Sequence, residues 1–233
     1  MIRLVTFDLD DTLWDVRPAL LRAEARQWDW LESHFGDRIH RDNEQLHRQL
    51  KRSLLETSPE LKHHISQFRQ RFIEGVLLEV GVPAEAAATA AAEAFAVFLA
   101  ERHQVAVFPE AEPMLRKLAQ HFKLGALTNG NADVFKTPLG EYFDVVYRAE
   151  EIGASKPAPD LFAAAAKAMA VQPEEMAHVG DHPEHDIEGA RRFGARAIWY
   201  NPNDETSAVA DASITCLSAL PAVLERLSSG KTA

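Results

Sequence analysis

Outside one long helical segment, this sequence alternates between short apolar runs and amphipathic helical patterns. The predicted strands are residues 2–7, 124–127, 144–147, 177–179, 195–200 and, at an edge, 212–215. Between them, apolar residues recur at the spacing of helices. Strands that alternate with helices form right-handed crossovers and a parallel sheet that is covered on both faces. The alternation therefore predicts an α/β fold with a Rossmann-like, doubly wound parallel sheet.

A long helical segment interrupts this pattern near its start. Four helices are expected. The first begins near Pro18, the second includes Leu46 to Leu54, the third begins at Ser58-Pro59, and the fourth covers residues 84–102. Four helices with apolar stripes can form a bundle of their own. We therefore predict a Rossmann-like catalytic core of residues 1–15 plus 105–233 and a helical cap subdomain of residues 16–104. Two short connections suit a lid that opens and closes.

Composition narrows the class of protein. The chain has 233 residues, and an apolar content of 46% is enough for a packed core. A formal net charge of −10 argues against nucleic acid or an anionic membrane as a partner. No uncharged apolar run approaches the roughly 18 residues of a spanning helix, and the acidic residues from Asp8 on leave no signal-peptide region. The single cysteine, Cys216, excludes an intrachain disulfide and fits a reducing compartment, so we expect a cytoplasmic protein. We also expect a monomer or a homodimer.

Polar side chains follow three of the predicted strands. They are Asp8 and Asp10, then Thr128 and Asn129, then Asp181, and Lys156 lies in a further loop. Each has an ordinary explanation by itself, as a turn, a helix cap or a solvated lysine. In a doubly wound sheet, however, ligands bind at the carboxyl ends of the strands, so these groups are expected around one crevice. Neighbouring carboxylates repel unless a cation intervenes, which favours a hard divalent ion such as Mg²⁺.

Four motifs in this order resemble those of the haloacid dehalogenase superfamily. They are Asp8-Leu9-Asp10-Asp11-Thr12, then Thr128, then Lys156, then Gly180-Asp181 followed by Asp186. The helical segment resembles the C1-type cap that this superfamily inserts after the first motif, so the resemblance covers the whole chain. The loop sequences Leu-Thr-Asn-Gly-Asn and Ser-Lys-Pro are most similar to those of bacterial flavin mononucleotide phosphatases.

The resemblance implies a metal site. It implies that Mg²⁺ is bound by the Asp8 carboxylate, the Asp10 backbone carbonyl and Asp181. Asp186 would act through a water molecule or by orienting Lys156. The implied partner is a small-molecule phosphate ester, with flavin mononucleotide as the candidate substrate.

The resemblance also implies a mechanism, that of a phosphomonoester hydrolase with an aspartyl-phosphate intermediate. Asp8 would attack phosphorus. Asp10 would protonate the leaving oxygen and later activate the hydrolytic water. Thr128 and Lys156 would hold the equatorial oxygens of the phosphoryl group in the transition state.

Other activities occur on the same core. The hydrolytic dehalogenases of this superfamily have the nucleophile but lack the second aspartate, because halide leaves without a proton. The presence of Asp10 therefore favours a phosphatase over a 2-haloacid dehalogenase. Phosphosugar mutase and phosphonatase activities, and a non-catalytic regulatory role, stay open as alternatives.

Three residues near the motifs are candidates for substrate contacts. Trp14 follows the nucleophile loop, where its ring can stack on an aromatic ligand or seal the seam between core and cap. Arg17 can pair with phosphate or ribityl oxygens, or lie in solvent. Asn129 can donate a hydrogen bond to the substrate.

A zinc site is a weaker hypothesis. His178, His182 and His185 lie near Asp181 in the sequence. Their spacing lacks a matched fourth ligand, and His178 lies on a predicted buried strand. We therefore expect magnesium rather than zinc.

Overall fold

The computed structural model describes residues 1–206 and 209–229. Two compact units are present in the chain, one made of Met1–Val16 and Ala106–Ala233 and the other of Arg17–Val105. We call the first the core unit and the second the helical unit. Each is described by itself.

The core unit contains a six-stranded sheet in which every neighbouring pair of strands is parallel. The strand order is β3-β2-β1-β4-β5-β6. The strands are β1 (Leu4–Phe7), β2 (Lys123–Thr128), β3 (Val145–Arg148), β4 (Met176–Gly180), β5 (Arg196–Tyr200) and β6 (Ala212–Ile214). The predicted α/β, doubly wound parallel sheet is confirmed.

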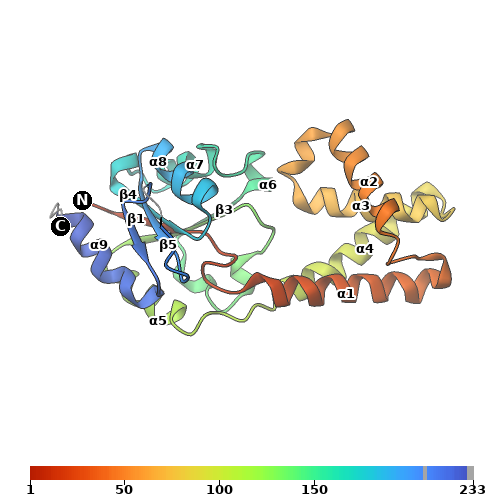
Figure 1. Cartoon of the computed structure of the whole chain (residues 1–233), viewed down its shortest axis with the longest axis horizontal. Coiled ribbons are helices and arrows are strands. Elements are labelled where there is room, and N and C mark those ends of the chain that lie inside the picture. Colours follow the sequence, from red (N-terminus) through yellow and green to blue (C-terminus); the bar gives the residue numbers. More distant parts are fainter. Residues whose placement is uncertain (207–208, 230–233) are drawn as a thin grey trace. The chain divides into compact units, whose positions relative to one another are not determined.

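Helices cover both faces of this sheet. Figure 1 shows α7 and α8 on one face and α5 and α9 on the other. The helices of the core unit are α5 (Ala111–Leu118), α6 (Ala149–Ile152), α7 (Asp160–Ala168), α8 (Gly189–Phe193) and α9 (Leu220–Ser229). Because both faces are covered, all four residues of β1 are buried. An apolar cluster joins Leu4 of this strand to Leu161 and Phe162 of α7.

The helical unit is built from four longer helices. They are α1 (Val16–Phe35), α2 (Glu44–Thr57), α3 (Ile65–Glu79) and α4 (Ala84–Arg102), with short 3-10 turns η1 (Gly36–Arg38) and η2 (Pro59–Lys62). The apolar cluster of this unit includes Leu31 of α1 and Phe72 of α3. The small residues Ala87, Ala91 and Ala94 of α4 join it, which lets α3 and α4 pack closely.

The third helix begins later than we predicted. Instead of opening at Ser58, the chain forms η2 over Pro59–Lys62, and α3 starts at Ile65. The Ser58 side chain makes no capping hydrogen bond, and the backbone N–H of His63 binds the carbonyl of Glu60 at 2.9 Å. This i to i+3 bond belongs to a 3-10 turn, so the α-helical pattern is interrupted there.

The segment between β2 and β3 also differs from the prediction. We expected a helix after Asn131, whereas the structure has two 3-10 turns, η3 (Val134–Lys136) and η4 (Gly140–Tyr142). Asp133 accepts a hydrogen bond from the backbone N–H of Phe135 at 3.1 Å, which closes a local turn. Pro138 then removes a backbone donor, so an α-helix cannot continue.

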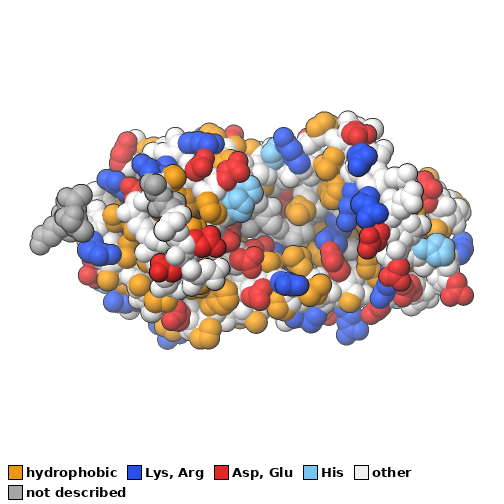
Figure 2. Space-filling view, in the orientation of Figure 1, with side chains coloured by type: hydrophobic (Ala, Val, Ile, Leu, Met, Phe, Trp, Pro, Cys, Tyr) orange, Lys and Arg blue, Asp and Glu red, His pale blue; other side chains and the backbone are white. Residues whose placement is uncertain are grey.

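The surface of the described residues carries mixed charge. Figure 2 shows Lys and Arg side chains interspersed with Asp and Glu on the face in view. Water and salt screen exposed ion pairs such as Arg116–Glu112, so they do not determine the fold. No helix in the described ranges is both long enough and apolar enough to cross a bilayer.

Two phenylalanines offer a matched test of this packing. Phe162 is fully buried under the sheet, whereas Phe135 is 62% exposed. Phe162→Ala should lower the free energy of unfolding by about 3–5 kcal/mol because it leaves a cavity. Phe135→Ala should change it by less than about 0.5 kcal/mol. Urea unfolding followed by circular dichroism measures both; equal losses would contradict the described core.

Candidate active site

The carboxyl ends of β1, β2 and β4 border one pocket of the core unit. Its cavity volume is about 180 Å³. Lining side chains come from the loop after β1, from the loop after β2, from Lys156 and from the segment after β4. Parallel strands end at the same edge of a sheet, which brings residues from distant parts of the sequence together here.

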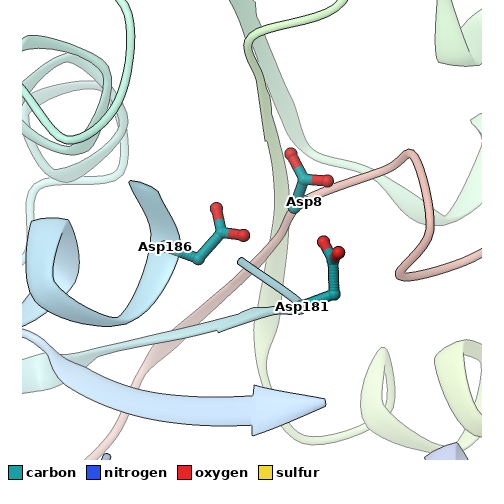
Figure 3. Close-up of side chains that lie close together, drawn as sticks. All are labelled: Asp8, Asp181 and Asp186. Atoms are coloured by element: carbon teal, nitrogen blue, oxygen red, sulfur yellow. The ribbon is translucent and has the colours of Figure 1, made fainter. Parts of the chain in front are cut away.

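Three carboxylates lie together in this pocket. Asp8 follows β1, Asp181 follows β4, and Asp186 lies on the short π-helix η6 (Pro183–Glu188). One oxygen from each lies within 4.8 Å of the others, and Figure 3 shows the three side chains pointing toward a common space. This arrangement resembles an oxygen ligand set for a hard cation.

Lys156 is a buried ammonium group between two of these carboxylates. Its Nζ donates to Asp8 Oδ1, Asp186 Oδ1 and the backbone carbonyl of Leu127, each at 2.6 Å. An ammonium group has three protons, so each has an acceptor. Although burial pushes the pKa of Lys156 down, the charges of Asp186 and Asp8 hold it above its ordinary value. The side chain is therefore a fixed positive charge.

The carboxylates differ in their electrostatic surroundings. Burial tends to raise the pKa of Asp186, but Lys156 and the hydrogen bond from His178 hold it below its ordinary range. Burial raises the pKa of Asp8 well above its ordinary value, against the opposing effect of Lys156. Burial, with the nearby charges of Asp186 and Asp11, raises the pKa of Asp181 to about 6. One ammonium does not balance three carboxylates, so the donor set fits a divalent cation.

Glycine at position 180 allows Asp186 to approach β4. A Cβ atom added to Gly180 would lie 2.3 Å from Asp186 Cγ, which is closer than real Cβ contacts. The carboxylate thus occupies the space that any other side chain at 180 would fill. Asp186 Oδ2 accepts a hydrogen bond from the backbone N–H of His182 at 3.0 Å. The backbone carbonyl of Asp181 accepts the indole N–H of Trp199 at 2.8 Å, which fixes the same loop.

Asp10 is held by Trp14, a contact that sequence analysis missed. Trp14 is fully buried, and its Nε1–H donates to Asp10 Oδ1 at 2.8 Å. The backbone N–H of Asp11 binds the carbonyl of Trp14 at 2.7 Å, with Asp11 in the left-handed region at φ 58°. The Thr12 hydroxyl donates to Asp181 Oδ1 at 3.3 Å. The indole therefore orients Asp10 from the interior, which does not favour the stacking role that we considered for Trp14.

The residues at the end of β2 form hydrogen bonds to the backbone of the loop that contains Lys156. Asn129 Oδ1 accepts the backbone N–H of Lys156 at 2.8 Å, and Asn129 Nδ2 donates to the Lys156 carbonyl at 3.0 Å. Thr128 is buried, and its Oγ1 accepts the Gly130 N–H at 2.9 Å. Asn129 thus connects two loops and also lines the pocket, and its contact with substrate stays a prediction. Arg17 lies in the first turn of α1, in the helical unit, and its substrate role stays a prediction.

The three histidines near Asp181 have separate surroundings. His178 is fully buried between Thr6 and Asp186, and burial lowers its pKa to about 4, so the ring is neutral near pH 7. His182 and His185 stack with ring centroids 3.9 Å apart and line the pocket. Among the described residues, the ligand set at the site consists of carboxylates alone. It does not favour the zinc hypothesis.

Comparison with known proteins now identifies the family. The model of the haloacid dehalogenase-like hydrolase family matches residues 2–194. The chain belongs to this family. The prediction of a haloacid dehalogenase superfamily enzyme is therefore confirmed.

Named relatives in the haloacid dehalogenase family include phosphatases. A 5-amino-6-(5-phospho-D-ribitylamino)uracil phosphatase of Escherichia coli is 37% identical over 203 residues, which are 87% of this chain and 85% of the relative. A glyceraldehyde 3-phosphate phosphatase of Methanopyrus kandleri is 31% identical over 202 residues, 83% of this chain and 82% of the relative. These relatives support the predicted phosphatase-type hydrolase.

A solved structure of the same family carries a different name. The crystal structure described as a 2-haloacid dehalogenase from Pseudomonas syringae pv. Tomato is 44% identical, with a TM-score of 0.94. The match covers 97% of this chain and 99% of that one. This likeness makes dehalogenation an activity that has to be tested beside phosphate release.

The close approach of Gly180 and Asp186 generates a prediction. Gly180→Ala should weaken Mg²⁺ binding about tenfold or more, because the new methyl group displaces the Asp186 carboxylate. Isothermal titration calorimetry with MgCl₂ measures this affinity. Gly75→Ala, in the middle of α3 with Leu50 Cδ2 at 3.3 Å from the added Cβ, is the matched control and should retain wild-type affinity. Wild-type affinity in Gly180→Ala would contradict the described site.

Proposed function

We propose that this protein is a Mg²⁺-dependent phosphomonoester hydrolase in which Asp8 is the nucleophile. One observation carries the proposal. The Asp8 carboxylate contacts the Lys156 ammonium, lies beside Asp181 and Asp186, and shares its pocket with a second carboxylate, Asp10, that a buried indole holds. A nucleophile, a cation site and a separate proton carrier are the parts that phosphoryl transfer needs.

The carboxylates of Asp8, Asp181 and Asp186 would hold the metal ion. Mg²⁺ prefers oxygen ligands and binds through a few carboxylates, which this set supplies. When bound, it would reduce the repulsion between a phosphate dianion and the carboxylates and would stabilise charge on the phosphoryl oxygens. The Asp10 backbone carbonyl, implied by the family resemblance, is a further ligand in this proposal.

The reaction would proceed in two displacements. In the first, an oxygen of Asp8 bonds to phosphorus, the bond from phosphorus to the ester oxygen breaks, and Asp10 gives its proton to the departing alcohol. In the second, water bonds to phosphorus, Asp10 takes a proton from that water, and the bond from phosphorus to Asp8 breaks. Inorganic phosphate leaves, and both carboxyl groups return to their starting forms.

Two further groups would stabilise the transferring phosphoryl group. Lys156 offsets the negative charge of Asp8, and a phosphoryl oxygen can replace one of its three acceptors. Thr128 uses an oxygen lone pair to accept the Gly130 N–H, so its hydroxyl proton can be donated to a phosphoryl oxygen. Both side chains are buried, which strengthens these electrostatic contacts.

Dehalogenation is the second candidate, because of the likeness to the Pseudomonas syringae protein. A halide leaves without a proton, so a dehalogenase has no use for a proton donor at the departing atom. The hydrogen bond from Trp14 to Asp10 orients a carboxylate that only the phosphatase reaction requires. The geometry therefore supports phosphate release over halide release.

We propose a phosphate at the end of a ribityl chain as the substrate class. The E. coli relative is named for 5-amino-6-(5-phospho-D-ribitylamino)uracil and matches over 85% of its length. Flavin mononucleotide, the candidate suggested by the loop motifs, carries its phosphate on the same kind of chain. The glyceraldehyde 3-phosphate relative is less similar, at 31% identity.

The role of Asp10 generates a prediction. Asp10→Asn should lower kcat by about 10²–10⁴-fold, because an amide cannot exchange the proton. Asp11→Asn is the matched control; its side chain accepts the Val16 N–H at 3.1 Å, a hydrogen bond that asparagine can also accept. Steady-state phosphate release from p-nitrophenyl phosphate measures both. Undiminished turnover by Asp10→Asn would refute the proposed proton transfer.

Substrate class and metal dependence are tested together. We expect kcat/KM for 5-amino-6-(5-phospho-D-ribitylamino)uracil and flavin mononucleotide to exceed that for glucose 6-phosphate by about tenfold or more. EDTA should abolish phosphate release and MgCl₂ should restore it. Dehalogenase activity is tested with 2-chloropropionate as the substrate, by measuring the chloride that is released. Equal rates on all phosphates would exclude the substrate class, and halide release without phosphate release would exclude the phosphatase.

A further inference from the structure

A chain of hydrogen bonds lies beneath the active site, on the side of the sheet that α7 covers. Thr6 in β1 and His178 in β4 are register partners on adjacent strands. Thr6 Oγ1 lies 2.9 Å from His178 Nδ1, and His178 Nε2 lies 3.2 Å from Asp186 Oδ1. Thr6 and His178 are fully buried, and Asp186 is 1% exposed. Neither Thr6 nor His178 has a part in the mechanism proposed above.

The chemistry of the acceptors fixes the direction of these bonds. An ionised Asp186 oxygen can only accept, so Nε2 of His178 carries a proton. A neutral imidazole then has no proton on Nδ1, which accepts the hydroxyl proton of Thr6. The other acceptor within reach of that hydroxyl, the Ala177 carbonyl, lies farther away at 3.3 Å. By giving Nδ1 a hydrogen-bond donor, the threonine hydroxyl therefore stabilises the tautomer that donates to Asp186.

Asp186 is the acceptor on which this chain ends. Its Oδ1 receives the Nε2–H of His178 and the Nζ–H of Lys156, and its Oδ2 receives the backbone N–H of His182. Three donors around one carboxylate leave it a single orientation. Rotation of the carboxylate would remove an acceptor from the lysine, whose remaining two protons bind Asp8 and Leu127.

The imidazole is itself held by packing. The ring of Phe162 meets the ring of His178 edge to face, with centroids 5.0 Å apart and an interplanar angle of 90°. The Phe162 ring also packs close to Gly189: a Cβ atom added to Gly189 would lie 3.2 Å from Phe162 Cε2. This contact supports the orientation in which the imidazole edge faces Asp186.

We propose that Thr6 and His178 are positioning residues that fix the Asp186 carboxylate, and through it Lys156, in the geometry for metal binding and turnover. The inference rests on the proposed function for its effects on metal affinity and on turnover. The tautomer and the orientation of Asp186 follow from the hydrogen bonds alone. Partners that orient a metal ligand in this way commonly change metal affinity or activity by about 10–100-fold when removed.

The test uses the full-length chain with Thr6→Val, which is isosteric and lacks the hydroxyl, and Thr6→Ser, which keeps it. Long-range ¹H–¹⁵N NMR spectra report which nitrogen of His178 is protonated. We expect the Nε2–H tautomer in the wild type and in Thr6→Ser, and in Thr6→Val a shifted ¹⁵N resonance of Nδ1, which has lost its hydrogen-bond donor. Calorimetry with MgCl₂ should show affinity reduced about tenfold in Thr6→Val and restored in Thr6→Ser.

Turnover measurements distinguish a positioning role from a purely structural one, because only a positioning role predicts different effects on kcat and KM. Thr6→Val should lower kcat with little change in KM, because Asp186 does not contact the substrate in this proposal. His178→Gln should retain more kcat than His178→Leu, since the amide nitrogen can still donate to Asp186. Thermal unfolding by circular dichroism checks that each variant is folded; if Thr6→Val is not, the two His178 variants decide the question.

Two results would overturn the proposal. One is a wild-type His178 protonated at Nδ1, and the other is wild-type Mg²⁺ affinity and kcat in folded Thr6→Val and His178→Leu. A wild-type protein without phosphatase activity would refute the proposed function instead. The NMR and calorimetric arms would still judge the positioning role in that case.

Discussion

A buried ammonium group between two buried carboxylates is the interaction on which the site depends. Lys156 joins Asp8, directly after the first strand, to Asp186, in the segment after the fourth, and binds the carbonyl of Leu127 near the end of the second. Breaking such a pair leaves an uncompensated charge in the interior, at a cost of about 3–5 kcal/mol. With one ammonium against three carboxylates, the same cluster could also hold a metal cation.

The parallel sheet makes this cluster possible, because β1, β2 and β4 are neighbours whose carboxyl ends share one edge. Local features of the backbone then orient the individual carboxylates. A left-handed turn at Asp11 returns the chain so that Trp14 can hold Asp10, and Gly180 leaves room for Asp186. The π-helix η6 carries Asp186 on a widened turn, a kind of distortion that is frequent at functional sites.

The fold and the groups at the strand ends were predictable from sequence, since periodicity defines strands and helices, and parallel strands bring their ends together. Side-chain direction was not. Nothing in the sequence distinguishes an indole that faces a ligand from one that faces Asp10, or an Asn129 amide that contacts substrate from one that binds the Lys156 backbone. His178 gave a signal, a polar residue within a buried strand, but its partner Thr6 becomes visible only with the strand register. The late start of α3 depended on a cap that Ser58 does not form.

The central claim is that Asp8 bonds to phosphorus during turnover. Mixing the Mg²⁺-loaded enzyme with p-nitrophenyl phosphate, quenching within milliseconds in acid and analysing the peptide that contains Asp8 by mass spectrometry tests it directly. We expect one phosphoryl group on Asp8, formed and lost at rates that match turnover, and none on the same peptide from Asp8→Asn. Full turnover by Asp8→Asn, or a phosphoryl group on another residue, would contradict it.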